Sequence, residues 1–83
     1  MPTVLFKNGW RFFFFANEGN EPIHIHVMKA EKSCKFFLNV EQVEIFLSSQ
    51  KNMNGKDLKS VKEIIFENFS YIVDSWTKFH KEK

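Results

Sequence analysis

The sequence lacks the paired cysteines of small secreted proteins and the long apolar segments of membrane proteins. Cys34 is its single cysteine, so no disulfide can form within the chain. Lys7 and Arg11 interrupt the apolar N-terminal region, so we expect neither a signal peptide nor a membrane span. The net charge of +2 is too small for a dedicated DNA-binding surface, although it permits RNA. These absences favour one cytoplasmic domain over residues 1–83 with no membrane association.

Aromatic side chains are abundant instead. The 83 residues include 11 Phe, 2 Trp and 1 Tyr, and residues 12–15 are four consecutive phenylalanines. Each large ring buries much apolar area, which is one way for a short chain to build a sufficient core.

Two strands at the N-terminus are predicted to form a hairpin. Residues 3–7 and 10–15 are prone to β-structure, and Asn8-Gly9 between them suits a two-residue turn because both residues tolerate positive φ. Alternation along the second strand gives two aromatic faces, one with Trp10, Phe12 and Phe14 and the other with Arg11, Phe13 and Phe15. We therefore expect cover on both faces: a helix on one, and a folded-back segment, a second copy or another protein on the other.

A loop at residues 16–22 leads into a third strand at 23–28. Its period of two places His24 and His26 on one face and the apolar residues Ile23, Ile25 and Val27 on the core face. A charged connection at 29–33 and a fourth strand at 34–38 follow.

Residues 40–48 have an ambiguous pattern. A helical stripe is formed by Val40, Val43, Phe46 and Leu47, whereas a strand is formed by Val43, Ile45 and Leu47. We favour a strand that continues the meander, followed by a polar connection at 48–55.

The C-terminal third has a helical pattern. Its apolar residues recur at spacings of three and four: Leu58, Val61, Ile65, Phe69, Ile72, Trp76 and Phe79. Asn54 is the expected N-cap, and Asp57 lies in the first turn, where the helix dipole favours an anion. About 26 residues would form a rod of about 39 Å, so the helix must bend near residues 68–70 or project past the sheet. The predicted fold is α+β, with an antiparallel meander of four or five strands packed against one long C-terminal helix.

Several ordered motifs resemble one known family. They are Met-Pro-Thr-Val-Leu at residues 1–5, the hairpin Gly-Trp-Arg-Phe-Phe-Phe at 9–14, Asn-Glu-Gly-Asn-Glu-Pro at 17–22 before His-Ile-His-Val at 24–27, Lys-Phe-Phe-Leu at 35–38, and a closing helix with Trp76. Together they resemble the bacterial domain-of-unknown-function family 4160. The resemblance implies a small stand-alone protein, often encoded beside another short protein in pairs like toxin–antitoxin modules, with no assigned activity.

Three kinds of function remain open. His24 and His26 could bind a metal, but a third ligand would have to come from residues that no spacing singles out, so we predict no bound cofactor. The candidate third ligands are Glu18, Glu21, Glu31, Cys34 and His80.

A metal-independent ribonuclease toxin is the enzymatic alternative. Its two histidines would act as acid and base on RNA, and Arg11 would stabilise the charge of the transition state.

We favour a protein–protein interaction module within a toxin–antitoxin-like pair, acting as a dimer or with a cognate partner. The two aromatic faces and a helix longer than its sheet suggest a surface that another chain covers. The expected binding residues are Trp10, Phe13, Phe15, Glu21 and Trp76.

Overall fold

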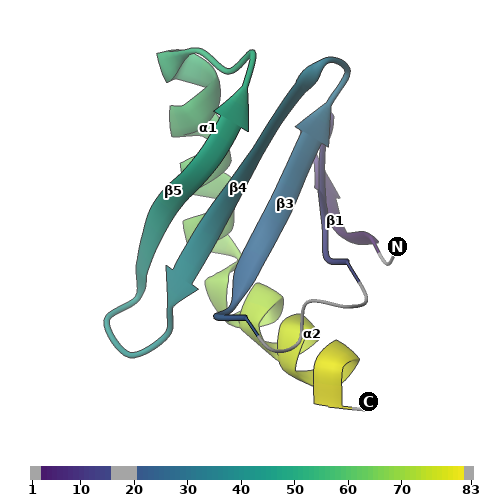
Figure 1. The fold of residues 1–83 in the computed structure, drawn as a ribbon, viewed down its shortest axis with the longest axis vertical. Helices are drawn as coiled ribbons and strands as arrows, with labels where there is room; N and C mark the ends of the chain where they lie inside the picture. The colour runs from purple at the N-terminus through teal and green to yellow at the C-terminus, as the bar shows by residue number, and fades with distance from the viewer. Residues whose placement is uncertain (1–2, 16–20, 82–83) are drawn as a thin grey trace.

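The structure is a computed structural model that describes residues 3–15 and 21–81, and it consists of one antiparallel sheet with two helices on one of its faces (Figure 1). The five strands lie side by side in chain order, as the predicted meander requires. They are β1 Thr3–Lys7, β2 Trp10–Phe13, β3 His24–Lys29, β4 Lys32–Asn39 and β5 Glu44–Lys51. The helices are α1 Gly55–Glu67 and α2 Phe69–Lys81. The α+β class and the antiparallel meander are therefore confirmed.

The first hairpin has the predicted turn but a shorter second strand. Asn8 and Gly9 both have positive φ, at 53° and 83°. β2 ends at Phe13 rather than Phe15, because Phe14 leaves the sheet and packs edge-on against Trp76 of α2, with ring centroids 5.1 Å apart. Most of the loop predicted at residues 16–22 lies outside the described residues.

The connections around β4 are shorter than predicted. Only residues 30–31 separate β3 from β4, so the expected charged connection at 29–33 is largely strand. Residues 48–51, expected in a polar connection, belong to β5, where Ser49 pairs with Lys35 and Lys51 pairs with Ser33. Their polar composition reflects their position at the end of an edge strand, where all four residues are exposed.

The C-terminal helix is two helices, which corrects the prediction of one long helix. Asn68 has φ −121° and ψ 23° and separates α1 from α2, within the region where a bend was one of the two expected outcomes. Its side-chain amide donates to the carbonyl of Ile64 at 2.8 Å, and its backbone N–H donates to the same oxygen at 3.1 Å, so both groups of Asn68 bond to the end of α1. Along its longest principal axis the Cα trace extends 35 Å, less than the rod of about 39 Å that an unbroken helix would form.

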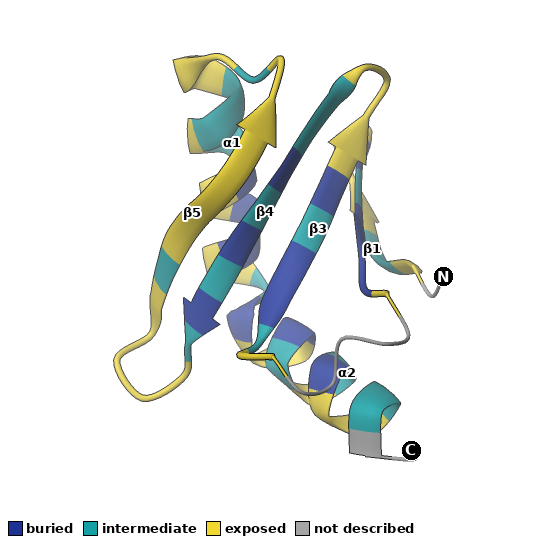
Figure 2. Cartoon of the chain, in the orientation of Figure 1, coloured by how far each residue is buried: buried dark blue, intermediate teal, exposed yellow. Residues whose placement is uncertain are grey.

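The core lies between the sheet and the helices. The inner face, which the helices cover, contributes Phe12, Ile25, Val27 and Phe36, all fully buried (Figure 2). The helices contribute Val61, Ile64, Ile65, Phe69, Ile72 and Trp76 to the same cluster. No helix in the described part of the chain is long and apolar enough to cross a membrane.

Candidate functional site

β3 places His24 and His26 together on the outer face of the sheet, the face away from the helices. Their ring centroids are 5.2 Å apart. The two side chains differ in exposure, because His24 is fully buried and His26 is half-buried. The predicted shared face is therefore present, but it offers one accessible imidazole rather than two.

His24 is buried by side chains from both helix and sheet. The ring of Trp76 from α2 lies 4.9 Å from its centroid, and the ring of Phe37 from β4 lies at 5.6 Å. Nδ1 of His24 lies 2.9 Å from the carbonyl oxygen of Pro22, and a carbonyl oxygen can only accept, so this nitrogen donates. The side chain of Glu21 lies farther out, 4.0 Å from Nδ1 and 3.6 Å from Nζ of Lys35. His24 is thus built into the packing where loop, sheet and α2 meet.

Phe13, at the centre of the second aromatic face of β2, is covered from within the chain. Phe13 stacks on His26 with ring centroids 5.5 Å apart, and Phe15 packs edge-on against Phe13 at 5.5 Å. The Arg11 guanidinium lies 4.9 Å from the centre of the Phe13 ring. Arg11 is also held by a hydrogen bond that its Nε donates to Oγ1 of Thr3. Phe13 is consequently 2% exposed. Neighbouring side chains therefore cover Phe13, whereas Phe15 on the same predicted face is 37% exposed.

The two tryptophans expected to bind a partner lie in the core. Trp10 is 4% exposed, and Nζ of Lys29 lies 5.2 Å from the centre of its ring. Trp76 is 5% exposed and packs between Phe14 and His80. Neither ring is presented to solvent, whereas Phe15 retains an exposed edge.

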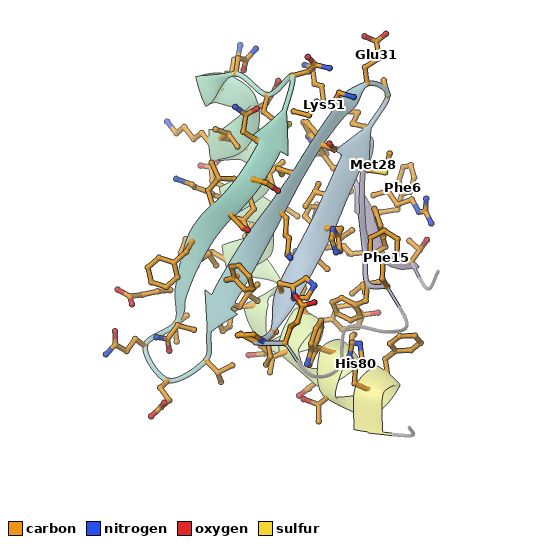
Figure 3. All side chains as sticks on the ribbon, viewed as in Figure 1. Phe6, Phe15, Met28, Glu31, Lys51 and His80 are labelled. Carbon is orange, nitrogen blue, oxygen red and sulfur yellow. The ribbon has the colours of Figure 1, made fainter. Side chains whose placement is uncertain are left out.

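The described candidate metal ligands do not converge on one point. Among the described residues, no group of three His, Cys, Asp or Glu side chains is placed to hold a metal ion. Glu31 lies at the opposite end of the sheet from His80 (Figure 3), and Glu18 falls outside the described residues. Cys34 faces the core, where burial raises the pKa of its thiol to about 12. A thiol with that pKa is neither a ready nucleophile nor a ready ligand.

A shallow cavity of about 310 Å³ lies on the outer face beside His26. Phe15, Lys35 and Lys51 are among its lining residues. Acid–base cleavage of RNA by two histidines needs both imidazoles within reach of the phosphodiester. Because His24 does not line this cavity, the predicted catalytic pair is not assembled around it.

Exposed apolar residues gather at another place, the β4–β5 hairpin. Val40, Val43, Phe46 and Leu47 are each 42–53% exposed, and we call them the hairpin surface. Figure 2 shows that β5 is exposed along almost its whole length. These residues were not among the predicted binding residues, although they form the helical stripe that made this segment ambiguous. The available signal in the sequence was this apolar stripe, which is compatible with a helix and with a strand but does not match the core face of either.

Two hollows flank the hairpin surface. One of about 590 Å³ is lined by Phe37, Val40, Phe46 and neighbouring residues, and one of about 190 Å³ by Val40, Val43, Phe69 and Val73, among others. Val43 has φ 53°, a left-handed conformation that β-branched residues rarely adopt. An exposed apolar turn in an unfavourable backbone conformation is the kind of feature that gathers at functional sites.

Comparison with known proteins gives one match. The family model described as domain of unknown function (DUF4160) matches residues 9–77. No curated protein and no solved structure matches the chain.

Proposed function

We propose that this chain, which belongs to the DUF4160 family of domains of unknown function, is a protein–protein interaction module that binds a cognate protein partner in the cytoplasm. The partner we propose is the product of the neighbouring gene in a toxin–antitoxin-like pair. The hairpin surface is the observation that carries this proposal. An apolar patch of several exposed side chains costs solubility, and in small soluble domains such patches commonly mark binding sites.

The aromatic residues elsewhere in the domain are less suited to binding a protein than the hairpin surface is. On the outer face, the rings around Phe13 already cover one another, and Trp10 and Trp76 belong to the core. The hairpin surface, by contrast, projects at the end of the sheet with a hollow on either side. Protein interfaces typically combine such an apolar centre with a polar rim.

The charges around the hairpin surface indicate what the partner presents. Glu41 lines the larger hollow and Asp74 the smaller one, and Glu44 begins the adjoining strand. None of the described residues that line these two hollows is basic. The expected partner therefore inserts apolar side chains and surrounds them with Lys or Arg.

Co-purification with the neighbouring gene product tests the proposal. We expect the double variant Val40→Ser/Val43→Ser to lose capture of the co-expressed partner by about tenfold or more, equivalent to about 1.4 kcal/mol of binding free energy. The domain itself should stay folded by circular dichroism, because both side chains are exposed.

Phe66→Ser/Tyr71→Ser is the matched control. Phe66 and Tyr71 are 48% and 54% exposed, similar to Val40 and Val43, but they lie on the helices. Capture should be unchanged in this control. Equal capture by both double variants, at the wild-type level, would refute the role of the hairpin surface.

A further inference from the structure

β5 is an open edge of the sheet. Within the part of the chain that the structure describes, it pairs with β4 alone, and seven of its eight residues are exposed. The free edge of such a strand presents N–H and C=O groups that another strand can pair with. The side chains and the register of β5 indicate which strand fits.

The sequence of β5 is complementary to itself when reversed. It begins with Glu44 and ends with Lys51, with Phe46 and Leu47 between them. In an antiparallel pair related by a two-fold axis, Glu44 of each copy can lie opposite Lys51 of the other. Opposite charges facing each other across two strands favour that register, whereas like charges disfavour it.

A β-bulge makes this register compatible with the faces of the sheet. In a regular strand Glu44 and Lys51 would point to opposite faces, because they are an odd number of residues apart. The β4–β5 register shifts here, since Lys35 pairs with Ser49 but Phe36 pairs with Leu47, which leaves Ser48 as an extra residue. Glu44 and Lys51 therefore both lie on the outer face, opposite Asn39 and Ser33.

We propose that the chain self-associates through β5, with two copies pairing antiparallel about a two-fold axis at Leu47–Ser48. The two sheets then become one continuous sheet, with Glu44 opposite Lys51 of the second copy at each end of the pairing. This inference goes beyond the proposed function, because it names a different partner, a second copy of the chain, and a different binding element, the edge of the sheet.

The pairing also buries the exposed apolar residues of β5. On the outer face, the two Phe46 rings become diagonal neighbours across the axis, at a separation that aromatic side chains can span. On the inner face, the two Leu47 side chains meet beside the axis. Phe46 and Leu47 belong to the hairpin surface, so self-association covers that part of it and leaves Val40 and Val43 at the turn for the cognate partner.

Charge reversal tests the register directly. By sedimentation over a range of concentrations, we expect the wild-type chain to dimerise and Glu44→Lys or Lys51→Glu to weaken the dimer by about tenfold or more, because each places two like-charged pairs in the interface. The double variant Glu44→Lys/Lys51→Glu should restore dimerisation. A mixture of the two single variants should form a heterodimer, since both of its end pairs are then attractive.

Glu63→Lys and Lys59→Glu are controls with the same change in net charge on the exposed side of α1, and they should dimerise like the wild type. A wild-type chain that stays monomeric at every concentration would overturn self-association. So would single variants that dimerise normally, or a double variant that fails to recover. None of these results depends on the capture experiment with Val40 and Val43, so either proposal can fail while the other stands.

Discussion

Val43 combines two unfavourable features in one residue. It is exposed to solvent although it is apolar, and its φ of 53° brings its branched Cβ close to the backbone. A left-handed conformation costs roughly 1–2 kcal/mol for a residue with a Cβ, while Asn tolerates it better. Two other turn positions with positive φ show the usual choice, Asn8 and Asn52, whereas Ala30 at φ 54° in the β3–β4 turn does not. Valine at this position is thus a poor choice for the turn and a good one for contact with another protein.

Replacing Val43 with Asn should stabilise the isolated domain. We expect the free energy of unfolding to rise by about 1 kcal/mol, since the strained turn is relieved and no buried contact is lost. Urea denaturation measures the change, and Val40→Asn, at an exposed turn position without positive φ, is the control that should gain nothing. An unchanged or lower midpoint for Val43→Asn would contradict the interpretation of strain.

At the scale of the elements, one ion pair joins the sheet to the start of α1. Nζ of Lys32, the first residue of β4, lies 2.8 Å from Oδ2 of Asp57. Asp57 also belongs to a capping box, in which its backbone N–H donates to Oδ1 of Asn54 at 2.8 Å and its carboxylate accepts from the Asn54 backbone N–H. The hydrogen bond from Lys32, together with the one from Asn54, lowers the pKa of Asp57 below its usual value of 3.8. The predicted N-cap is confirmed, whereas the ion pair depends on the tertiary structure.

The contribution of this pair should depend on pH. Because the pKa of Asp57 is lower in the folded state, its stabilisation is fully present above the unfolded value of 3.8 and is lost as the pH falls through the folded value. Lys32→Met should therefore lower the melting temperature at pH 7 and have a smaller effect near pH 2. Lys59→Met, on the exposed side of α1, is the control expected to show little difference at either pH. A Lys32→Met deficit of the same size at both values would contradict a role for the charged pair.

At the scale of the whole molecule, the helices cover only one of the two faces of the sheet. The outer face is closed around Phe13 by neighbouring rings, while the β5 side has an open edge and an apolar turn. His24 connects the loop before β3, the sheet and α2, because it contacts Pro22, Phe37 and Trp76. Because His24 is fully buried in these contacts, we infer that it contributes to the stability of the fold.

Truncation of His24 should therefore act on the whole fold. We expect His24→Ala to lower the free energy of unfolding by about 2–4 kcal/mol, as for other large side chains removed from a core, and His26→Ala to lower it by about half as much or less. Urea denaturation with unchanged slope measures both, and His26→Ala is the matched control because it lies on the same strand face. Equal and small effects would show that the packing around His24 is dispensable.

The order of the elements was largely predictable because its signals are local. The Asn8-Gly9 turn, the alternation along β3, the spacing of apolar residues in the helices and the cap at Asn54 each depend on residues close in sequence. The break at Asn68 was only partly predictable, because the apolar stripe continues through it. The edge position of β5 was hidden, since its polar end looks like a loop when no neighbour is considered.

The sequence by itself determined the meander, its first turn, the helical C-terminal third and the common face of His24 and His26. These follow from backbone preferences and from side-chain periods of two and 3.6 residues. Only the tertiary structure decided that Trp76 would bury His24, that Phe15 and His26 would cover Phe13, and that the bulge at Ser48 would align Glu44 with Lys51 on one face. Burial and pairing depend on which distant segments come into contact, and the periodicity of one segment does not indicate which other segments it will contact.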